Sequence, residues 1–482
     1  MTDSSRAAPA LVLFRRDLRL ADHSALTAAA ETGAPVIPVY VLDDETPGRW
    51  RLGGASRWWL HQSLTSLASD LEALGSRLVL RRGHTERALL HLIEETGARS
   101  VFFTRGYEPF QRALEERLTA TLEARGVSLR RFGGQILVEP ESLANLAGEP
   151  FRVFTPFFRA LSQRGVPSTP LPAPRKLAAP DRWPRSDALE SWCLEPTKPD
   201  WAGGIRAAWQ PGETAARERL AHFIETALAS YRSRRDEPGV DGTSRLSPHL
   251  AFGEIGPRQI WQAVQAAEAA GDQAAADAYL REVGWREFSY HLLFHFPHLP
   301  EAPFRPEFAA FPWRDDDSAL EAWRRGRTGY PIVDAGMRQL WQTGWMHNRV
   351  RMIVASFLIK HLLLPWQIGA DWFRDTLVDA DLANNAASWQ WVAGSGADAA
   401  PYFRIFNPVL QGEKFDARGD YVRIFVPELA KLSASLIHKP WTASAVALRR
   451  YGVTLGESYP HPVVDHAAAR ARALAAFATV KK

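Results

Sequence analysis

The first 132 residues alternate between short apolar runs and longer stretches with apolar residues at helical spacing. Runs of the first kind are typical of buried strands, and stretches of the second kind are typical of helices. The pattern predicts five strands, at residues 11–14, 36–42, 78–81, 101–104 and 129–132. It predicts the intervening helices at residues 21–32, 55–74, 86–95 and 111–125. Alternating strands and helices imply an α/β domain with a parallel, Rossmann-like sheet that carries helices on both faces.

The pattern changes after residue 213, and helical spacing then dominates. Helices are predicted at residues 214–231, 258–270, 274–296, 318–325, 331–343, 347–364 and 371–377. Residues 214–482 are therefore expected to form an all-α domain. Between Pro167 and Pro199 lie eight prolines, which exclude a long helix or a central strand. We interpret this proline-rich stretch as an ordered or semi-rigid connector that lies over the surface, and we expect residues 133–213 to join the two domains.

Composition narrows the classes of protein that this chain can belong to. Its 482 residues carry a formal net charge of only +4, so any nucleic-acid footprint must be local. The single cysteine, Cys193, excludes an intramolecular disulfide and disfavours a metal site, which fits a reducing cytoplasm. No secretory signal or membrane span is apparent in the sequence, and we expect no membrane association. No G-x-G-x-x-G follows the first strand, which argues against an NAD-dependent dehydrogenase.

Four segments combine residues that are hard to explain by packing alone. The segment 242–248, GTSRLSP, places hydroxyls and an arginine before a predicted helix start, where Ser247 would be the N-cap, and such a start suits a diphosphate. Glu282, Trp285 and Arg286 share one helix face. This face can be interpreted as a solvated ion pair between Glu282 and Arg286, or as the edge of a pocket for a flat polar ligand. Asn348, Arg351 and Met352 share another face, with Arg349 beside them.

The fourth segment, residues 379–391, reads DADLANNAASWQW. It holds two acids and two amides followed by two indoles. A metal site needs converging carboxylates or histidines, and these acids lack evident co-ligands, so we expect no metal here. A hydrogen-bonding cradle for a ring system is the better interpretation. The chain also has 18 tryptophans, most of them at or after Trp201, which could pack a core, line a ligand site or carry electrons.

Seven motifs, in order along nearly the whole chain, resemble the photolyase/cryptochrome family. They are FRRDLR at 14–19, TSRLS at 243–247, WREF at 285–288, TGYP at 328–331, WMHNRVRM at 345–352, DADLANNAASWQW at 379–391 and PYFRIFNP at 401–408. The resemblance implies an N-terminal α/β domain that binds an antenna chromophore (1–132), a connector (133–213) and a helical domain that binds FAD and DNA (214–482). It implies a monomer with no obligate protein partner, cytoplasmic and associated with the nucleoid when bound to damaged DNA.

The resemblance also implies roles for individual residues. The FAD contacts are expected at Tyr231, Thr243, Ser244, Arg245, Leu246, Ser247, Arg351, Asp379, Ala380, Asp381 and Asn385, with Asn385 facing flavin N5. The catalytic pocket is expected at Glu282, Asn348, Met352, Asn385 and Trp391. DNA contacts are expected at Arg235, Glu282, Trp285, Arg286, Asn348, Arg349, Arg404 and Gln411. Electrons are expected to pass along Trp389, Trp366 and an exposed Trp313.

The implied activity is light-driven splitting of cyclobutane pyrimidine dimers in DNA by electron transfer from excited, fully reduced FAD. A cryptochrome photoreceptor is the main alternative, but Asn385, Met352 and Glu282 keep the repair version of three positions that plant-type cryptochromes change. A (6-4) photolyase resembles the chain less, because that class has a histidine pair where Asn348 and Met352 stand here. A generic flavin oxidoreductase would need a substrate base or redox cysteine that is not evident. The antenna is expected to be 5,10-methenyltetrahydrofolate, with 8-hydroxy-5-deazaflavin second, although the positions after Tyr107-Glu108 depart from one folate-binding pattern.

Overall fold

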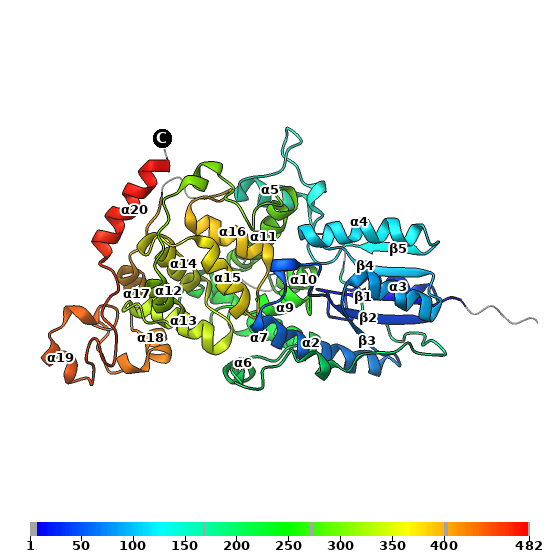
Figure 1. Cartoon of the computed structure of the whole chain (residues 1–482), viewed down its shortest axis with the longest axis horizontal. Helices are drawn as coiled ribbons and strands as arrows, with labels where there is room; N and C mark the ends of the chain where they lie inside the picture. Colours follow the sequence, from blue (N-terminus) through cyan, green and yellow to red (C-terminus); the bar gives the residue numbers. More distant parts are fainter. Residues whose placement is uncertain (1–6, 167–168, 269–272, 400–402, 481–482) are drawn as a thin grey trace, which may run out of the picture.

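The computed structural model describes residues 7–166, 169–268, 273–399 and 403–480. Within these residues a parallel five-stranded sheet occupies one end of the molecule, and helices of the C-terminal half fill the rest (Figure 1). The strands are β1 (Ala10–Phe14), β2 (Val36–Leu42), β3 (Val79–Arg82), β4 (Ser100–Thr104) and β5 (Ser128–Phe132). Their order is β3-β2-β1-β4-β5, which is a doubly wound arrangement with β1 at the centre. The predicted α/β fold is confirmed.

Four helices join the strands: α1 (Ser24–Glu31), α2 (Gly54–Ala73), α3 (Thr85–Thr96) and α4 (Pro109–Glu123). The first starts three residues later than predicted, because Asp22 adopts a positive φ of 54° and His23 caps the helix. The ring nitrogen Nδ1 of His23 accepts a hydrogen bond from the backbone N–H of Leu26. A local turn and cap therefore set this helix start, whereas the apolar spacing alone suggested an earlier one.

The connector at 133–213 holds helices on either side of its proline-rich stretch. It contains α5 (Phe154–Arg164) and α6 (Gly203–Ala208), and Phe157 and Leu161 of α5 are buried. The ring of Phe154 stacks on Trp285, with centroids 3.7 Å apart and planes 6° apart. The apolar face of α5, which precedes the proline-rich stretch, thus packs against the helical part of the chain. The described part of the proline-rich stretch forms no α-helix, as expected.

The second half of the chain forms the predicted helical assembly. Its helices are α7 (Glu213–Thr226), α8 (Tyr231–Arg234), α9 (Ser247–Phe252), α10 (Pro257–Glu268), α11 (Gln273–His295), α12 (Asp317–Arg324), α13 (Pro331–Thr343), α14 (Asn348–Ser356), α15 (Trp366–Thr376), α16 (Leu382–Ala393), α17 (Pro408–Phe415), α18 (Asp420–Phe425), α19 (Ala445–Arg449) and α20 (His466–Val480). The helix predicted at 347–364 is shorter, since α14 gives way to a π-helical turn, Phe357–His361. None of the helices in the described residues is both long and apolar enough to cross a membrane.

Buried polar contacts join the sheet region to the helices. Arg16, just after β1, lies 3.3 Å from Glu108 and 3.5 Å from Asp381. Burial disfavours its charge, but these two carboxylates prevail and raise the pKa of Arg16. Glu213 accepts backbone N–H bonds from Leu20, at 2.6 Å, and from Ala21. These contacts fix the sheet against the helices that carry the site described next.

Candidate active site

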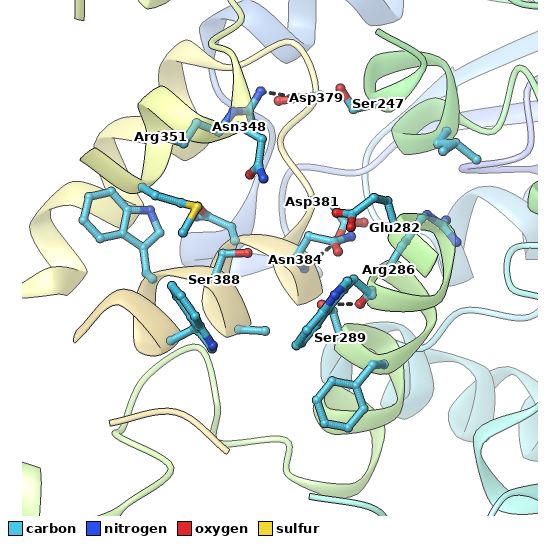
Figure 2. A pocket seen from close by; sticks show the side chains of 18 of the residues that line it. Ser247, Glu282, Arg286, Ser289, Asn348, Arg351, Asp379, Asp381, Asn384 and Ser388 are labelled. Atoms are coloured by element: carbon cyan, nitrogen blue, oxygen red, sulfur yellow. Dashed lines mark hydrogen bonds and ion pairs between the residues drawn. The ribbon is translucent and has the colours of Figure 1, made fainter. Parts of the chain in front are cut away.

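A cavity of about 580 Å³ opens among the helices of the C-terminal half. Segments from α8, α9, α11, α14 and α16, together with the loops before α9 and α16, line it (Figure 2). It gathers residues of all four segments together with two further predicted residues, Tyr231 and Arg235. The segment residues are Thr243, Ser244, Arg245, Leu246, Ser247, Glu282, Trp285, Arg286, Asn348, Arg349, Arg351, Met352, Asp379, Ala380, Asp381, Asn385, Trp389 and Trp391. Residues up to 160 positions apart in sequence thus line a single cavity.

The loop before α9 presents hydroxyl groups to the cavity. Tyr279 donates a hydrogen bond to Ser244 Oγ at 3.0 Å, and Trp345 Nε1 donates to Ser247 Oγ at 3.1 Å. The predicted N-cap role of Ser247 is wrong, because Leu246 occupies the cap position and no side chain caps the helix. The first backbone N–H groups of α9 are thus not taken by a side-chain cap, as a phosphate-binding helix start requires.

Asp379 and Asp381 sit at the other side of the cavity in different environments. Arg351 Nη2 lies 2.7 Å from Asp379 Oδ2, and Figure 2 shows the arginine directed at this carboxylate. The second oxygen of Asp379, Oδ1, is buried without a hydrogen-bond partner among the described residues. An uncompensated carboxylate oxygen is costly in a protein interior, so this wall of the cavity suits a ligand that donates a hydrogen bond.

Both carboxylate oxygens of Asp381 instead accept hydrogen bonds from other residues of the protein. Its Oδ1 caps α16 by accepting from the backbone N–H of Asn384 at 2.8 Å and from Asn384 Nδ2 at 2.7 Å. Its Oδ2 accepts from the hydroxyl of Tyr290 and faces Arg16. The buried carboxylate therefore anchors the start of α16. This anchoring places Asn385, whose Nδ2 donates to Ala370 O at 3.0 Å, in the cavity wall.

Glu282 and Arg235 form an ion pair at the cavity wall. Arg235 Nη1 lies 2.6 Å from Glu282 Oε1, and both side chains are only partly buried. The alternative of a solvated Glu282–Arg286 pair is wrong, since Arg286 contacts Glu287 at 3.4 Å and lies over the ring of Tyr290. The interpretation of this helix face as a pocket edge is the one the structure supports.

The α14 residues complete the opposite wall. Asn348 projects into the open space between the labelled side chains in Figure 2. Arg349 lies 2.9 Å from Asp236, and its Nη1 is 3.8 Å from the sulfur of Met352. An amide, a thioether and a partly exposed guanidinium therefore lie within one helical turn at the cavity wall.

The three predicted electron-transfer tryptophans differ in position. Trp389 lines the cavity and is buried against Phe373, with ring centroids 5.0 Å apart. Trp366 is also buried and begins α15, one turn before Gly369, which packs directly on Trp389. Trp313 is half-buried rather than exposed and packs on Phe311, with centroids 4.4 Å apart. The passage of electrons along these three residues stays a prediction.

Two predicted DNA-contacting residues lie outside the cavity lining, Arg404 and Gln411. Arg404 is exposed, and its guanidinium lies 5.1 Å from the ring centre of Phe406. The motif at 401–408 begins with two residues that lie outside the described part of the chain.

Several residues that line the cavity were not predicted from the sequence, among them Tyr279, Phe373 and Asn384. Asn384 belongs to the segment 379–391, which was predicted to form part of the site. Tyr279 and Phe373 gave no local signal apart from helical spacing.

These residues fit FAD on grounds of chemistry. A helix start without a side-chain cap and neighbouring hydroxyls suit a diphosphate. The unpartnered Asp379 oxygen and the Asn385 amide suit polar edges of a ring system, and Trp389 and Phe373 supply apolar walls. Among the described residues, no cluster of three or more His, Cys, Asp or Glu side chains could hold a metal ion.

Two family models match most of the chain. Residues 10–175 match the model described as DNA photolyase, and residues 279–479 match the FAD binding domain of DNA photolyase. A deoxyribodipyrimidine photo-lyase from Agrobacterium fabrum is 56% identical over 479 residues, which are 99% of each chain. Cryptochrome-2 of Arabidopsis thaliana is 41% identical over 95% of this chain and 77% of its own length.

Solved structures agree with the sequence relatives. The crystal structure of a bacterial class III photolyase from Agrobacterium tumefaciens superposes with a TM-score of 0.97 at 55% identity. That match covers 100% of this chain and 99% of the other. The matched FAD-binding model and the cavity chemistry together identify FAD as the cofactor. The chain belongs to the photolyase/cryptochrome family of FAD-binding proteins.

Proposed function

We propose that this protein is a deoxyribodipyrimidine photo-lyase that uses light to split cyclobutane pyrimidine dimers in DNA. The observation that carries the proposal is that Glu282, Met352 and Asn385 line the same cavity as the FAD-binding residues. These three positions distinguish repair enzymes from plant-type cryptochromes in the family. The name and extent of the 56% identical relative point the same way.

The chain's own residues would hold FAD along two sides of the cavity. Thr243, Ser244, Arg245 and Ser247 would bind the diphosphate and ribityl chain, and Arg351 would orient the side chain of Asp379 beside the ring system. Bound, fully reduced FAD supplies an electron when it absorbs light. The amide of Asn385 can donate or accept a hydrogen bond, so it can adapt to a ring nitrogen with or without a proton.

The damaged dinucleotide would enter the cavity after leaving the duplex. Flipping a lesion that already pairs badly costs less than flipping an intact base pair. Trp285 and Trp391 would enclose the flipped bases, and Asn348 and Met352 would contact them from the opposite wall. Arg235, Arg286 and Arg349, with Arg404 and Gln411 outside the cavity, would contact the DNA backbone and make binding depend on salt.

Glu282 would act on the lesion directly. In the family the acid at this position hydrogen-bonds the pyrimidine carbonyls, where negative charge develops as the dimer accepts an electron. Arg235, 2.6 Å away, would orient this carboxyl.

The buried Trp389, Trp366 and half-buried Trp313 would pass electrons between the surface and the cavity when the cofactor must be reduced.

The decisive experiment is direct. The reduced protein is mixed with an oligonucleotide that contains a thymine dimer, and restored thymine absorbance is measured under near-UV or blue light. Repair that requires light is expected. A protein that binds FAD but leaves the dimer intact would favour the cryptochrome alternative, to which the 41% identity with cryptochrome-2 also points. Repair of a (6-4) photoproduct instead would reassign the substrate.

We also propose an antenna chromophore, with 5,10-methenyltetrahydrofolate first and 8-hydroxy-5-deazaflavin second. The Tyr107-Glu108 pair is taken up by internal contacts, since the Tyr107 hydroxyl donates to Glu139 at 2.8 Å and Glu108 faces Arg16. A binding mode that does not use this pair is therefore favoured.

The division into residues 1–132, 133–213 and 214–482, with an antenna in the first part, stays a prediction. So do the monomeric state, the lack of an obligate protein partner and the cytoplasmic, nucleoid-associated location.

A further inference from the structure

The indole of Trp285 rests on a residue of the connector. Trp285 belongs to α11, is half-buried and lines the cavity of the candidate active site. Phe154, the first residue of α5, is only 1% exposed, and α5 lies beside α11 (Figure 1). The two rings are nearly parallel, with centroids 3.7 Å apart and planes 6° apart, so they overlap almost fully. One face of the indole is therefore covered by the protein, although the same side chain lines the cavity.

Full overlap is not the arrangement that a free pair of aromatic rings prefers. Such pairs favour offset or edge-to-face arrangements, with centroids about 4.5–7 Å apart. Phe288 follows this preference, since it meets the indole of Trp285 edge-on at 5.9 Å. The face-to-face contact between Phe154 and Trp285 therefore depends on other contacts that hold the two rings in place.

A carboxylate from the far side of the cavity holds the start of α5. The backbone N–H of Phe154 donates a hydrogen bond to Asp398 Oδ2 at 3.1 Å. The first N–H groups of a helix have no partner within the helix, and they attract negative charge. Asp398 follows α16 and itself lines the cavity. Phe154 is thus fixed by the chain segment that comes after the other predicted pocket indole, Trp391.

A glycine in α11 allows this close approach. Gly284 directly precedes Trp285, and a Cβ at this position would lie 2.4 Å from the ring of Phe158. Phe158 lies one helical turn after Phe154 and stacks on it, with centroids 5.5 Å apart. The guanidinium of Arg281 lies 4.8 Å over the ring of Phe154. Phe154 is therefore held between its neighbours and cannot turn away from the indole.

Ordinary packing of an aromatic core is the simpler interpretation of these contacts. It accounts for Phe157 and Leu161, which are buried on the same helix. It does not account for the overlap of Phe154 and Trp285, because an offset pair would bury similar apolar area. A half-buried indole at a cavity wall can also adopt other rotamers, and a fixed ring on one face removes that freedom.

We propose that Phe154 is a positioning residue that fixes the plane of Trp285, so that the indole can stack against a flipped base of the lesion, and that Asp398 holds Phe154 in place. The inference rests on the proposed repair function. A base gains stacking energy only where it overlaps an aromatic ring, and an indole that is already fixed loses less freedom on binding. Undamaged duplex is held mainly by phosphate contacts, so Phe154 would favour dimer-containing DNA selectively.

The first test compares binding of full-length, FAD-loaded protein to one oligonucleotide with and without a thymine dimer, in the dark, by fluorescence anisotropy. Phe154→Leu keeps an apolar side chain but removes the flat ring. It is expected to raise the Kd for dimer DNA at least fivefold and to leave the Kd for undamaged DNA within twofold. Phe157→Leu is the matched control, because Phe157 is 2% exposed on the same helix but packs on Phe288 and His291. It should leave both constants within twofold.

A double-mutant cycle distinguishes positioning of the indole from a general structural role. In a Trp285→Ala background, Phe154→Leu should weaken binding to dimer DNA no further, because the ring that it positions is gone. A full effect in that background overturns the inference. Asp398→Ala is a second variant, which leaves both rings present. It is expected to weaken binding to dimer DNA about threefold, and this effect should likewise vanish in the Trp285→Ala background.

The orientation of the indole is measured separately, without DNA, by fluorine NMR of protein labelled with 5-fluorotryptophan. The Trp285 resonance is assigned by its loss in Trp285→Phe. It should move in Phe154→Leu, where the stacked ring is lost, and stay in place in Phe157→Leu. An unmoved resonance in Phe154→Leu overturns the inference, as does a moved resonance with unchanged binding to dimer DNA. If the unaltered protein shows no preference for dimer DNA and Trp285→Ala has no effect, the proposed repair function fails instead, and the role of Phe154 in lesion binding fails with it.

Discussion

Arg235 holds the carboxylate of Glu282 at 2.6 Å, although Arg235 follows the end of α8, Glu282 belongs to α11, and the two lie 47 positions apart. The pair sits where a flipped lesion would meet the protein, with each side chain about a quarter exposed. The carboxyl group is therefore oriented before substrate arrives, and it keeps one oxygen for the lesion. Because Glu282 is already oriented, less free energy is needed to bring its carboxyl group into the geometry that stabilises charge developing on the lesion.

Replacement of this carboxyl should impair chemistry more than binding. Glu282→Ala is expected to lower the repair yield per absorbed photon about tenfold with pre-reduced protein and saturating DNA, and Glu282→Gln less, because the amide N–H can donate a hydrogen bond at the same place. Glu237→Ala is the control, since Glu237 is an exposed acid that pairs with Arg234. A yield unchanged in Glu282→Ala would remove this residue from the reaction.

Arg349 should contribute one phosphate contact. In the free protein it pairs with Asp236 at 2.9 Å and lies over the ring of Phe415. Arg349→Ala is expected to weaken binding to damaged and undamaged DNA alike and to lower the slope of log affinity against log salt by about 0.9. Asp236→Asn should tighten binding, since the guanidinium then loses a competing anion.

The control for Arg349 is Arg87→Ala, because Arg87 pairs with Glu45 on the sheet region, away from the cavity. Binding constants measured at several salt concentrations by fluorescence anisotropy give the slopes. An unchanged slope in Arg349→Ala would mean that this arginine serves only to position Met352, whose sulfur lies 3.8 Å away.

Trp313 should matter for photoreduction and not for repair. Its half-buried ring lies at the outer end of the predicted tryptophan series. Trp313→Phe is expected to slow light-driven reduction of oxidised FAD at least tenfold, because phenylalanine is much harder to oxidise. Repair by protein that was reduced chemically beforehand should be unchanged. Loss of both activities would instead assign Trp313 a structural role on Phe311.

Gly369 allows Trp389 to approach α15. A Cβ at this position would lie 2.1 Å from Trp389 and 2.6 Å from Leu358, both in a tightly packed core. Gly369→Ala is therefore expected to lower the free energy of unfolding by about 1–3 kcal/mol and to disturb photoreduction through Trp389. Gly203→Ala, where a Cβ meets nothing within 4 Å, should leave both unchanged. Urea denaturation and flavin absorbance measure the two effects.

Glu287 should give the protein a distinctive dependence of stability on pH. Burial raises the pKa of this carboxyl to about 7, despite Arg286 and a backbone N–H from Leu137. Its ordinary pKa is 4.5, so the unfolded chain releases this proton at lower pH than the folded protein. The contribution of Glu287 to stability therefore falls as pH rises from about 4.5 to about 7.

Glu287→Gln should remove this component. The free energy of unfolding of the variant, relative to that of the unaltered protein, is expected to improve as pH rises from 5 to 8. Buried histidines act in the opposite sense, since burial lowers the pKa of His291 to about 3, and they are present in both proteins. Chemical denaturation at several pH values measures the difference, and a difference independent of pH would contradict the assignment.

The sequence predicts the sheet closely, because a buried parallel strand leaves a local apolar signature. Strand β2 begins and ends at the predicted residues. The membership of the cavity was likewise predictable, since the family motifs name its residues. The partners of those residues were not predictable. Glu282 pairs with Arg235 instead of Arg286, and Ser247 accepts from Trp345 instead of capping α9.

The reason is that helical spacing identifies which residues share one face, but not which other segment packs against that face. The stacked pair of Trp341 and Trp372, by contrast, belongs to no recognised motif. Trp372 and Trp341 lie on different helices, and each alone is an ordinary aromatic residue at helical spacing. Only the packing of α13 beside α15 brings them together.

Arg16 belongs to the sheet region and faces Asp381 at the start of α16. Because this contact joins the sheet to the helices, the two halves of the chain are not separable modules. A fragment that holds only the helices would keep every residue of the cavity lining but would leave Asp381 without its buried cation. The start of α16, and with it Asn385, would then lose an electrostatic anchor. In evolutionary terms, the sheet cannot be exchanged freely for another domain, because one of its arginines helps to build the wall of its neighbour's site.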